Sequence, residues 1–144
     1  MTKDVLLSIT GMQFEPDAEG GEITTVNRAQ YYKKNDSHYI LYDEVTEGFS
    51  ELTHNRIKIK EHEVILTRKG LLNVQMDFEE QKKNLSNYHT PYGDLVIGID
   101  TSKVSIKEDE TEILVTVEYA LEMNYEHLSD STIQIKIRAV QPET

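Results

Sequence analysis

Two stretches near the end of the sequence alternate strictly between apolar and polar residues, and this pattern limits the folds open to the chain. Residues 113 to 123 place one apolar row against one polar row, and residues 133 to 139 repeat the arrangement. The first apolar row consists of Ile113, Val115, Val117, Tyr119, Leu121 and Met123. Successive side chains of a β-strand point to opposite faces, so both stretches are predicted to be half-buried antiparallel strands.

Shorter segments with the same alternation occupy much of the remaining chain. They are Val5–Ile9, Ile23–Tyr31, His38–Glu44, Ile57–Ile59, Val64–Leu66, Val74–Phe78, Leu95–Ile99 and Val104–Ile106. Turn-forming residues separate them at Asp17–Gly21, Asn35–Ser37, Glu47–Gly48, Lys69–Gly70, Asp109–Glu110 and in the polar stretch that ends at Ser129–Ser131. Connections this short favour hairpins in series, so the sequence predicts a meander of about ten strands.

The segment Asp77–Leu85 is the one place where a helix is considered. Asp77 and Glu80 have the spacing of a helix-capping pair. Met76 and Phe78, however, continue the strand alternation from Val74, so a turn or loop between two strands is an equally good interpretation. We therefore expect an all-β chain with little or no helix.

The apolar faces of many short strands must be buried either in a sandwich or in a closed barrel. We favour the barrel because closure removes exposed strand edges, and Gly93 and Gly98 offer positions for the bends that a small barrel needs. A sandwich remains the alternative. The 144 residues are enough for one hydrophobic core, so we expect a single domain over residues 1–144.

The charge balance and the missing cysteines restrict the possible partners and compartments. The chain has 26 acidic and 15 basic residues and a formal charge of −11, which repels nucleic acid. It has no cysteine, which suits a reducing cytoplasm. No apolar run approaches the roughly 20 residues of a membrane span, and the N-terminus reads as a strand rather than a signal peptide. We predict a cytoplasmic protein with no nucleic-acid or membrane partner.

No motif for catalysis, metal binding or cofactor binding is found in the sequence. The histidines are scattered, at His38, His54, His62, His89 and His127. The segment His62–Leu66 begins like a zinc-protease helix but has Leu66 where the second histidine is required. Phosphate-binding glycine loops and the G-x-S-x-G motif are also missing. We therefore expect no metal, no cofactor and no catalytic residue, and an enzyme is the less favoured reading.

Several segments together resemble a known family. They are His38–Glu44, Leu66–Gly70 leading to Met76–Phe78, Tyr88-His-Thr-Pro-Tyr-Gly93, and the closing pair of alternating strands. In this order they resemble the YwiB-like family of small bacterial proteins, and the resemblance covers nearly the whole chain. It implies a closed antiparallel meander β-barrel of the calycin or lipocalin-like type. The family is classed as a domain of unknown function, so the resemblance implies no substrate, cofactor or catalytic residue.

One group of residues points to a ligand site inside the barrel. If Val64 and Leu66 face the interior, strand alternation places Arg68 on the same face at the strand end. The candidate ligand-binding residues are Arg68, Tyr42, Glu44, Tyr88, Tyr92 and Tyr119. An arginine among tyrosines can bind a carboxylate by charge-assisted hydrogen bonds. The alternatives are an Arg68 guanidinium in water, a structural Arg68–Glu44 ion pair, and tyrosines that only pack in the core.

These observations lead to two hypotheses for function. The first is non-enzymatic binding of a small, largely apolar ligand, with or without a carboxylate, in the barrel interior. The second is a protein–protein interaction module or a self-associating barrel, such as a homodimer, that acts through its outer surface. Phe49 and Val140 are the apolar residues that suggest an exposed patch.

Overall fold

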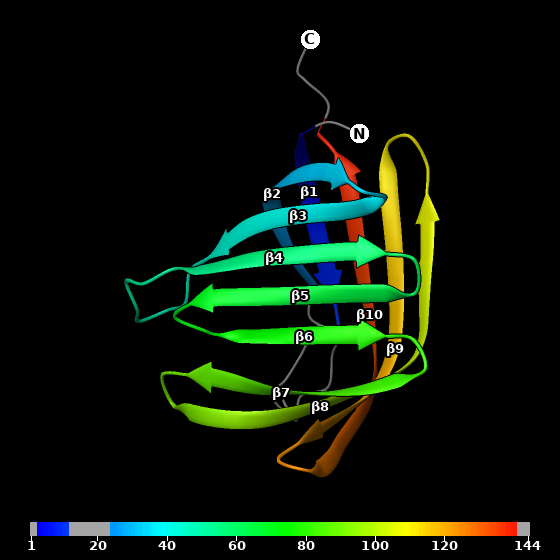
Figure 1. Ribbon diagram of the computed structural model, residues 1–144. Helices are drawn as coiled ribbons and strands as arrows, with labels where there is room; N and C mark the ends of the chain where they lie inside the picture. Colours follow the sequence, from blue (N-terminus) through cyan, green and yellow to red (C-terminus); the bar gives the residue numbers. More distant parts are fainter. Residues whose placement is uncertain (1–2, 12–23, 141–144) are drawn as a thin grey trace.

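The structure is a computed structural model that describes residues 3–11 and 24–140 (Figure 1). Its ten strands are β1 (Asp4–Thr10), β2 (Thr24–Lys34), β3 (Ser37–Glu44), β4 (Thr53–Lys60), β5 (Glu63–Gly70), β6 (Val74–Glu79), β7 (Lys82–Thr90), β8 (Gly93–Glu108), β9 (Glu112–Met123) and β10 (Glu126–Ala139). Within the described ranges no residue is helical. The predicted all-β fold is confirmed.

The strands form one antiparallel sheet in meander order. The sheet runs β6-β5-β4-β3-β2-β1-β10-β9-β8-β7, so the first and last strands pair with each other and bring the two halves together. The sheet curls round until β6 and β7 lie side by side (Figure 1). The predicted barrel is thus confirmed over the sandwich. In the described part of the chain, no helix is long and apolar enough to cross a membrane.

The seam between β6 and β7 is completed mainly by side chains. Backbone hydrogen bonds cross it between Asn73 and His89, at 3.0 and 2.9 Å. Farther along, Asn84 Nδ2 donates to the Asp77 carbonyl at 3.2 Å, and Ser86 Oγ donates to the Gln75 carbonyl. These bonds satisfy strand-edge carbonyls that a neighbouring backbone would otherwise satisfy. The barrel is therefore nearly closed.

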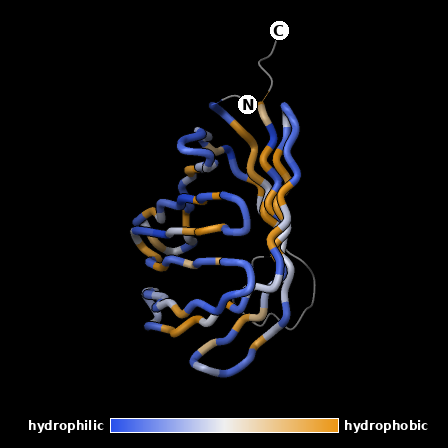
Figure 2. Tube along the Cα trace, turned by 45° about the vertical axis from the view of Figure 1, so that its right-hand side comes forward, coloured by the Kyte–Doolittle hydropathy of each residue, from blue (hydrophilic) through white to orange (hydrophobic). Residues whose placement is uncertain are grey.

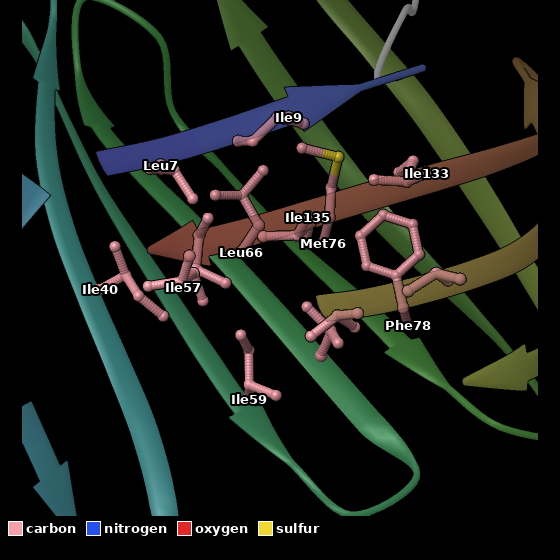
Figure 3. Close-up of a cluster of buried hydrophobic side chains, with 14 of the residues drawn as sticks. Leu7, Ile9, Ile40, Ile57, Ile59, Leu66, Met76, Phe78, Ile133 and Ile135 are labelled. Atoms are coloured by element: carbon pink, nitrogen blue, oxygen red, sulfur yellow. The ribbon is translucent and has the colours of Figure 1, made fainter. Parts of the chain in front are cut away.

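The apolar rows of the strands meet in the middle of the barrel. Figure 2 shows apolar and polar residues following one another along the trace. Figure 3 shows side chains from both sides of the barrel pointing toward one another. Those labelled in the figure are Leu7, Ile9, Ile40, Ile57, Ile59, Leu66, Met76, Phe78, Ile133 and Ile135, and all are at most 4% exposed. This packed cluster occupies the middle of the barrel and leaves the polar inward residues at its two ends.

Strand β8 joins two segments that the sequence presents separately. Leu95, Ile97 and Ile99 lie at odd positions, whereas Val104 and Ile106 lie at even positions. A register shift between Thr101 and Lys103 separates the two sets in the pairing with β9. An extra residue in a strand reverses the alternation of its side chains. One bulged strand can therefore keep apolar residues facing inward along its whole length.

The structure locates two turns that the sequence left open, and a third predicted turn lies outside the described residues. The possible helix at Asp77–Leu85 is a hairpin turn at Glu80–Gln81, because Met76 and Phe78 keep the strand alternation and bury their side chains in the core. The turn expected in the polar stretch that ends at Ser129–Ser131 lies at the start of that stretch, at Asn124–Tyr125. Both of those residues have positive φ angles, as a tight hairpin turn requires. The turn predicted at Asp17–Gly21 lies outside the described residues.

Gly70 is a position where the backbone requires glycine. Its φ is +124°, and a Cβ atom added there lies 2.2 Å from the Leu52 carbonyl oxygen. We expect Gly70→Ala to lower the free energy of unfolding by about 3 kcal/mol, because positive φ and a backbone clash add together. Gly48 is the matched control, since its φ is +89° with nothing within 4 Å of a Cβ. Gly48→Ala should cost only about 1 kcal/mol. Equal losses of unfolding free energy for Gly70→Ala and Gly48→Ala, measured by urea denaturation, contradict the backbone clash at Gly70.

Candidate functional site

Arg68 lies on the inward face of β5, near one end of the barrel. The strand alternation places it in the same row as Val64 and Leu66, and its side chain is 11% exposed. Strands β3, β5 and β7 end at this end of the barrel, on the left of Figure 1, and we call it the Arg68 end. The opposite end, on the right, is called the His38 end.

Three neighbouring side chains fix the Arg68 guanidinium. Its Nε donates to Asn55 Oδ1 at 3.0 Å, and its Nη1 donates to the Tyr88 hydroxyl at 2.7 Å. Its Nη2 forms a close ion pair with Glu44 Oε1. Asn55 Nδ2 also donates to Glu44 Oε1, at 3.3 Å. A planar guanidinium held on three sides in this way keeps one orientation, which is the arrangement that favours recognition of a planar carboxylate.

A pocket of about 450 Å³ opens beside Arg68. Arg68, Glu44 and Tyr42 supply charged and polar groups on one side. Ile9 and Val26 supply apolar surface, and the remaining lining residues are Thr25 and Asn27. The pocket thus places a fixed cation and other polar groups beside a small apolar surface, so a small amphipathic molecule is the kind of ligand that fits it best.

The protonation states at this end of the barrel follow from burial and nearby charge. Burial raises the pKa of Tyr42 to about 12, with Glu44 adding to the rise and Arg68 opposing it. Burial acts to lower the pKa of Arg68, but Tyr88 and Glu44 outweigh that effect and leave the pKa raised. Tyr42 is therefore a neutral phenol at physiological pH, and Arg68 is a permanent cation. Glu44 already balances the charge of Arg68, so a bound anion has to compete with Glu44.

The structure brings together four of the six candidate residues: Arg68, Tyr42, Glu44 and Tyr88. Tyr92 is elsewhere, because the chain reverses at Pro91–Tyr92 between β7 and β8 and breaks the alternation that placed Tyr92 beside Tyr88. The interior position predicted for Tyr92 is wrong: it is 87% exposed, with its ring against Phe49 at 6.1 Å.

Tyr119 is buried, but it does not line the Arg68 pocket. It packs edge to face against Phe78, with the ring centroids 5.2 Å apart. Burial raises the pKa of Tyr119 to about 12, against an opposing effect of Ser131. Its place in the core matches the alternative in which this tyrosine only packs.

Asn55 is a site residue that the sequence did not single out. It is 3% exposed and lies directly opposite Tyr42 on one side and Arg68 on the other. The signal was present in the alternation of β4, where Asn55 shares the inward row with Ile57 and Ile59. A polar amide in an apolar row needs a hydrogen-bond partner inside the protein, so it marks a polar site.

Three carboxylates form a separate cluster on the outside of β5 and β6. One oxygen from each of Glu63, Asp77 and Glu79 lies within 4.8 Å of the others. Glu63 is also paired with Lys60 Nζ at 2.9 Å. Burial raises the pKa of Asp77 to about 7, and Glu63 adds to the rise by hydrogen bonding and by charge. The cluster therefore tends to hold a proton between its carboxylates.

The raised pKa of Asp77 predicts a pH-dependent stability. The folded protein keeps a proton on Asp77 that the unfolded chain releases near its ordinary pKa of 3.8, so stability falls as the pH rises from there to about 7. We expect Asp77→Asn to stabilise the protein by about 1 kcal/mol at about pH 8, after allowing for solvent screening, and to change little at about pH 4. Urea denaturation at both pH values measures the difference in unfolding free energy between Asp77→Asn and the wild type. Glu118→Gln, an exposed carboxylate on β9, is the control. A gain of the same size at both pH values contradicts the prediction.

Comparison with known proteins identifies the family. Residues 7–135 match the model of a family described as a domain of unknown function, DUF1934. The crystal structure of the YwiB protein from Bacillus subtilis is similar, with a TM-score of 0.79 and 19% identity over 96% of this chain and 93% of that chain. At this identity the likeness shows a shared fold. No curated protein matches the chain. The resemblance to the YwiB-like family is confirmed, and the chain belongs to the DUF1934 family.

Proposed function

We propose that this protein binds a small molecule with an apolar body and a carboxylate in the pocket at the Arg68 end, without catalysing a reaction. The observation that carries the proposal is the fixed Arg68 guanidinium beside a pocket of about 450 Å³. Packed core side chains fill the middle of the barrel, so the ligand lies at its mouth.

The apolar part of the ligand contacts Ile9 and Val26, which line the same pocket. The Tyr42 hydroxyl is neutral at physiological pH and supplies a further hydrogen-bond donor. The carboxylate takes the place that Glu44 occupies at Arg68. The Glu44 side chain is 38% exposed and ends β3, so it can turn toward water without leaving an unsolvated charge behind.

Because the ligand has to displace Glu44 from Arg68, the Glu44 carboxylate competes with the ligand. Two carboxylates held at one guanidinium leave an unbalanced negative charge in a partly desolvated place. We expect Glu44→Gln to bind octanoate about tenfold more tightly than the wild type, which corresponds to about 1.4 kcal/mol. 1-Octanol has the same apolar chain without the charge, so the substitution should leave its affinity unchanged.

Isothermal titration calorimetry with octanoate and 1-octanol tests the proposal, and native mass spectrometry confirms the stoichiometry. Asp43→Asn is the matched control, because Asp43 precedes Glu44 but points outward and contacts His54 at 2.7 Å. It should bind octanoate as the wild type does. The proposal fails when neither the wild type nor Glu44→Gln shows saturable octanoate binding, or when Asp43→Asn raises the affinity as much as Glu44→Gln.

The alternative of a self-associating or protein-binding surface stays a prediction. Phe49 and Val140, the residues that suggested it, are both half-buried. The cytoplasmic location also stays a prediction.

A further inference from the structure

The outer side of strands β2 to β5 carries positive charge, although the chain as a whole is acidic. These four strands are neighbours in the sheet, and β3, β4 and β5 cross the front of Figure 1. We call their outward residues, from Arg28 onward in β2, the basic face. Its cations are Arg28, Lys34, Arg56, Lys58, Lys60 and Lys69. Its carboxylates are Asp43 and Glu63. Six cations against two carboxylates leave an excess of four positive charges, on a chain with a formal charge of −11.

Both carboxylates of the basic face have partners, whereas most of its cations do not. Lys60 Nζ lies 2.9 Å from Glu63 Oε1, and Asp43 Oδ1 lies 2.7 Å from His54 Nδ1. Within the described ranges, the cations that form no ion pair are Arg28, Lys34, Arg56, Lys58 and Lys69. The positive charge of this face is therefore available to a partner of opposite charge.

A tyrosine pair orients two of these cations. Arg56 Cζ lies 5.8 Å and Lys58 Nζ 5.6 Å from the centre of the Tyr39 ring. Tyr32 stacks on the same ring, with the ring centroids 4.8 Å apart and the ring planes 7° apart. Tyr32, Tyr39 and Lys58 follow one another across β2, β3 and β4 on the half of the face nearer the His38 end. Cation–π attraction restricts the two cations without neutralising them.

The spacing of the cations matches that of an extended peptide. Arg56, Lys58 and Lys60 occupy alternate positions of β4, so their Cα atoms are about 7 Å apart. Carboxylates at every second residue of an extended peptide have the same repeat, so successive ones can face successive cations. Leu41 is 38% exposed and lies opposite Arg56, and Ile65 lies opposite Lys58. Both supply apolar surface between the charges.

The surroundings of the basic face favour a short acidic segment over a long polyanion. Carboxylates follow on both sides of the face, with Asp4 on β1 and Glu79 on β6. A nucleic acid that crosses the face continues into these carboxylates and is repelled there. The Tyr39 ring already has a second ring and two cations against it, which leaves it little surface for a base to stack on. A peptide requires neither the length nor the stacking.

We propose that the basic face docks a short acidic segment of a partner protein. The segment lies extended along the face, with alternate carboxylates against the unpaired Arg56 and Lys58, and its other side chains contact Leu41. The acidic remainder of the chain repels the partner elsewhere and thereby restricts it to this face. None of these residues lines the pocket at the Arg68 end, so docking is independent of the function proposed above.

Fluorescence anisotropy with labelled decapeptides tests the proposal. A peptide that alternates Glu and Thr has all its carboxylates on one side when extended, and we expect it to bind saturably at low salt. A peptide of the same composition with its Glu residues in one block places them on both sides, and should bind about fivefold more weakly. A peptide that alternates Gln and Thr should not bind. Equal affinity for the two acidic peptides, or no saturable binding of either, overturns the proposal.

Two double variants with the same change in net charge locate the docking surface. Arg56→Gln/Lys58→Gln should weaken binding of the alternating acidic peptide by about tenfold, because two unpaired cations are lost. Lys103→Gln/Lys107→Gln is the matched control, because both lysines are exposed on β8, which pairs with no strand of the basic face. It should bind as the wild type does. Circular dichroism checks that both variants keep the all-β spectrum. Equal losses in the two variants show that binding follows net charge alone and contradict the proposal.

A short oligothymidylate and vesicles of phosphatidylglycerol serve as probes for the other anionic partners. We expect both to bind more weakly than the alternating acidic peptide, since the chain around the face is acidic. Tighter binding of the oligothymidylate that is lost in Arg56→Gln/Lys58→Gln identifies a nucleic-acid surface instead. Tighter binding of the vesicles with the same loss identifies a membrane surface. Either result overturns the proposal of a protein partner.

Discussion

Truncation of Phe78 to alanine should lower the free energy of unfolding by about 3–5 kcal/mol. Phe78 is 1% exposed and lies within the packed cluster of Figure 3, where six strands contribute the labelled side chains. Removal of the ring loses its burial and leaves a space that the surrounding packed side chains and paired strands collapse into only in part. Urea denaturation followed by circular dichroism measures the loss.

The ring of Tyr119 is the main specific partner of Phe78, at 5.2 Å and an angle of 76°. A double-mutant cycle with Phe78→Ala and Tyr119→Leu should show a coupling of about 0.5–1.5 kcal/mol. Phe49→Ala is the control, because Phe49 is half-buried in the loop between β3 and β4. It should cost no more than about 1 kcal/mol. A loss as large as that of Phe78→Ala contradicts the view that the barrel interior is the only tightly packed core of the described chain.

Strand alternation was sufficient to predict most of this fold. In a sheet with one buried face, each apolar row has to face the same way, so the sequence records the register directly. The rows of β9 and β10 show this, since Ile113 pairs with Ile137 and Val117 with Ile133. Alternation alone left a sandwich open, and the barrel was favoured because closure removes exposed strand edges.

The misplaced features come from points where alternation is interrupted. Tyr92 was assigned to the row of Tyr88, but Tyr92 lies in the two-residue turn after β7, and alternation holds only within one strand. The bulge at Thr101 joined two segments that differ in parity, and one added residue cannot be recognised from spacing alone. Turn positions depend on single backbone angles, which alternation does not report.

The polar ends of the barrel were harder to predict because they depend on strands that are distant in sequence. Arg68 and Glu44 could be matched because both end an inward row, as the alternation showed. At the opposite end of the barrel, the Tyr31 hydroxyl lies 2.6 Å from His38 Nδ1, and His38 Nε2 lies 3.3 Å from Glu108 Oε2. This group could not be predicted, because Glu108 lies after the bulge in β8 and its inward position depends on that extra residue. Contacts across a barrel require the register of every strand between the partners.

Replacement of Arg68 by methionine should have the largest effect on the proposed binding. We expect octanoate affinity to fall by about 100-fold, since the charge-assisted hydrogen bonds to the carboxylate are lost. The free energy of unfolding should also fall, by about 2 kcal/mol, because Glu44, Asn55 and Tyr88 lose their shared partner. This is less than the loss of a fully buried ion pair, since the Glu44 side chain is 38% exposed and can be hydrated.

The double variant Arg68→Met/Glu44→Gln separates the two effects. Removal of the unpaired carboxylate should restore about 1 kcal/mol of stability relative to Arg68→Met, whereas octanoate binding should stay lost because no cation remains. Lys69→Met is the matched control, because the neighbouring Lys69 is exposed and points outward. It should keep both the stability and the octanoate affinity of the wild type. A double variant that binds octanoate as the wild type does would show that the ligand carboxylate is held by something other than Arg68. A double variant no more stable than Arg68→Met would show that Glu44 is fully hydrated without its partner, and its displacement by a ligand would then cost little.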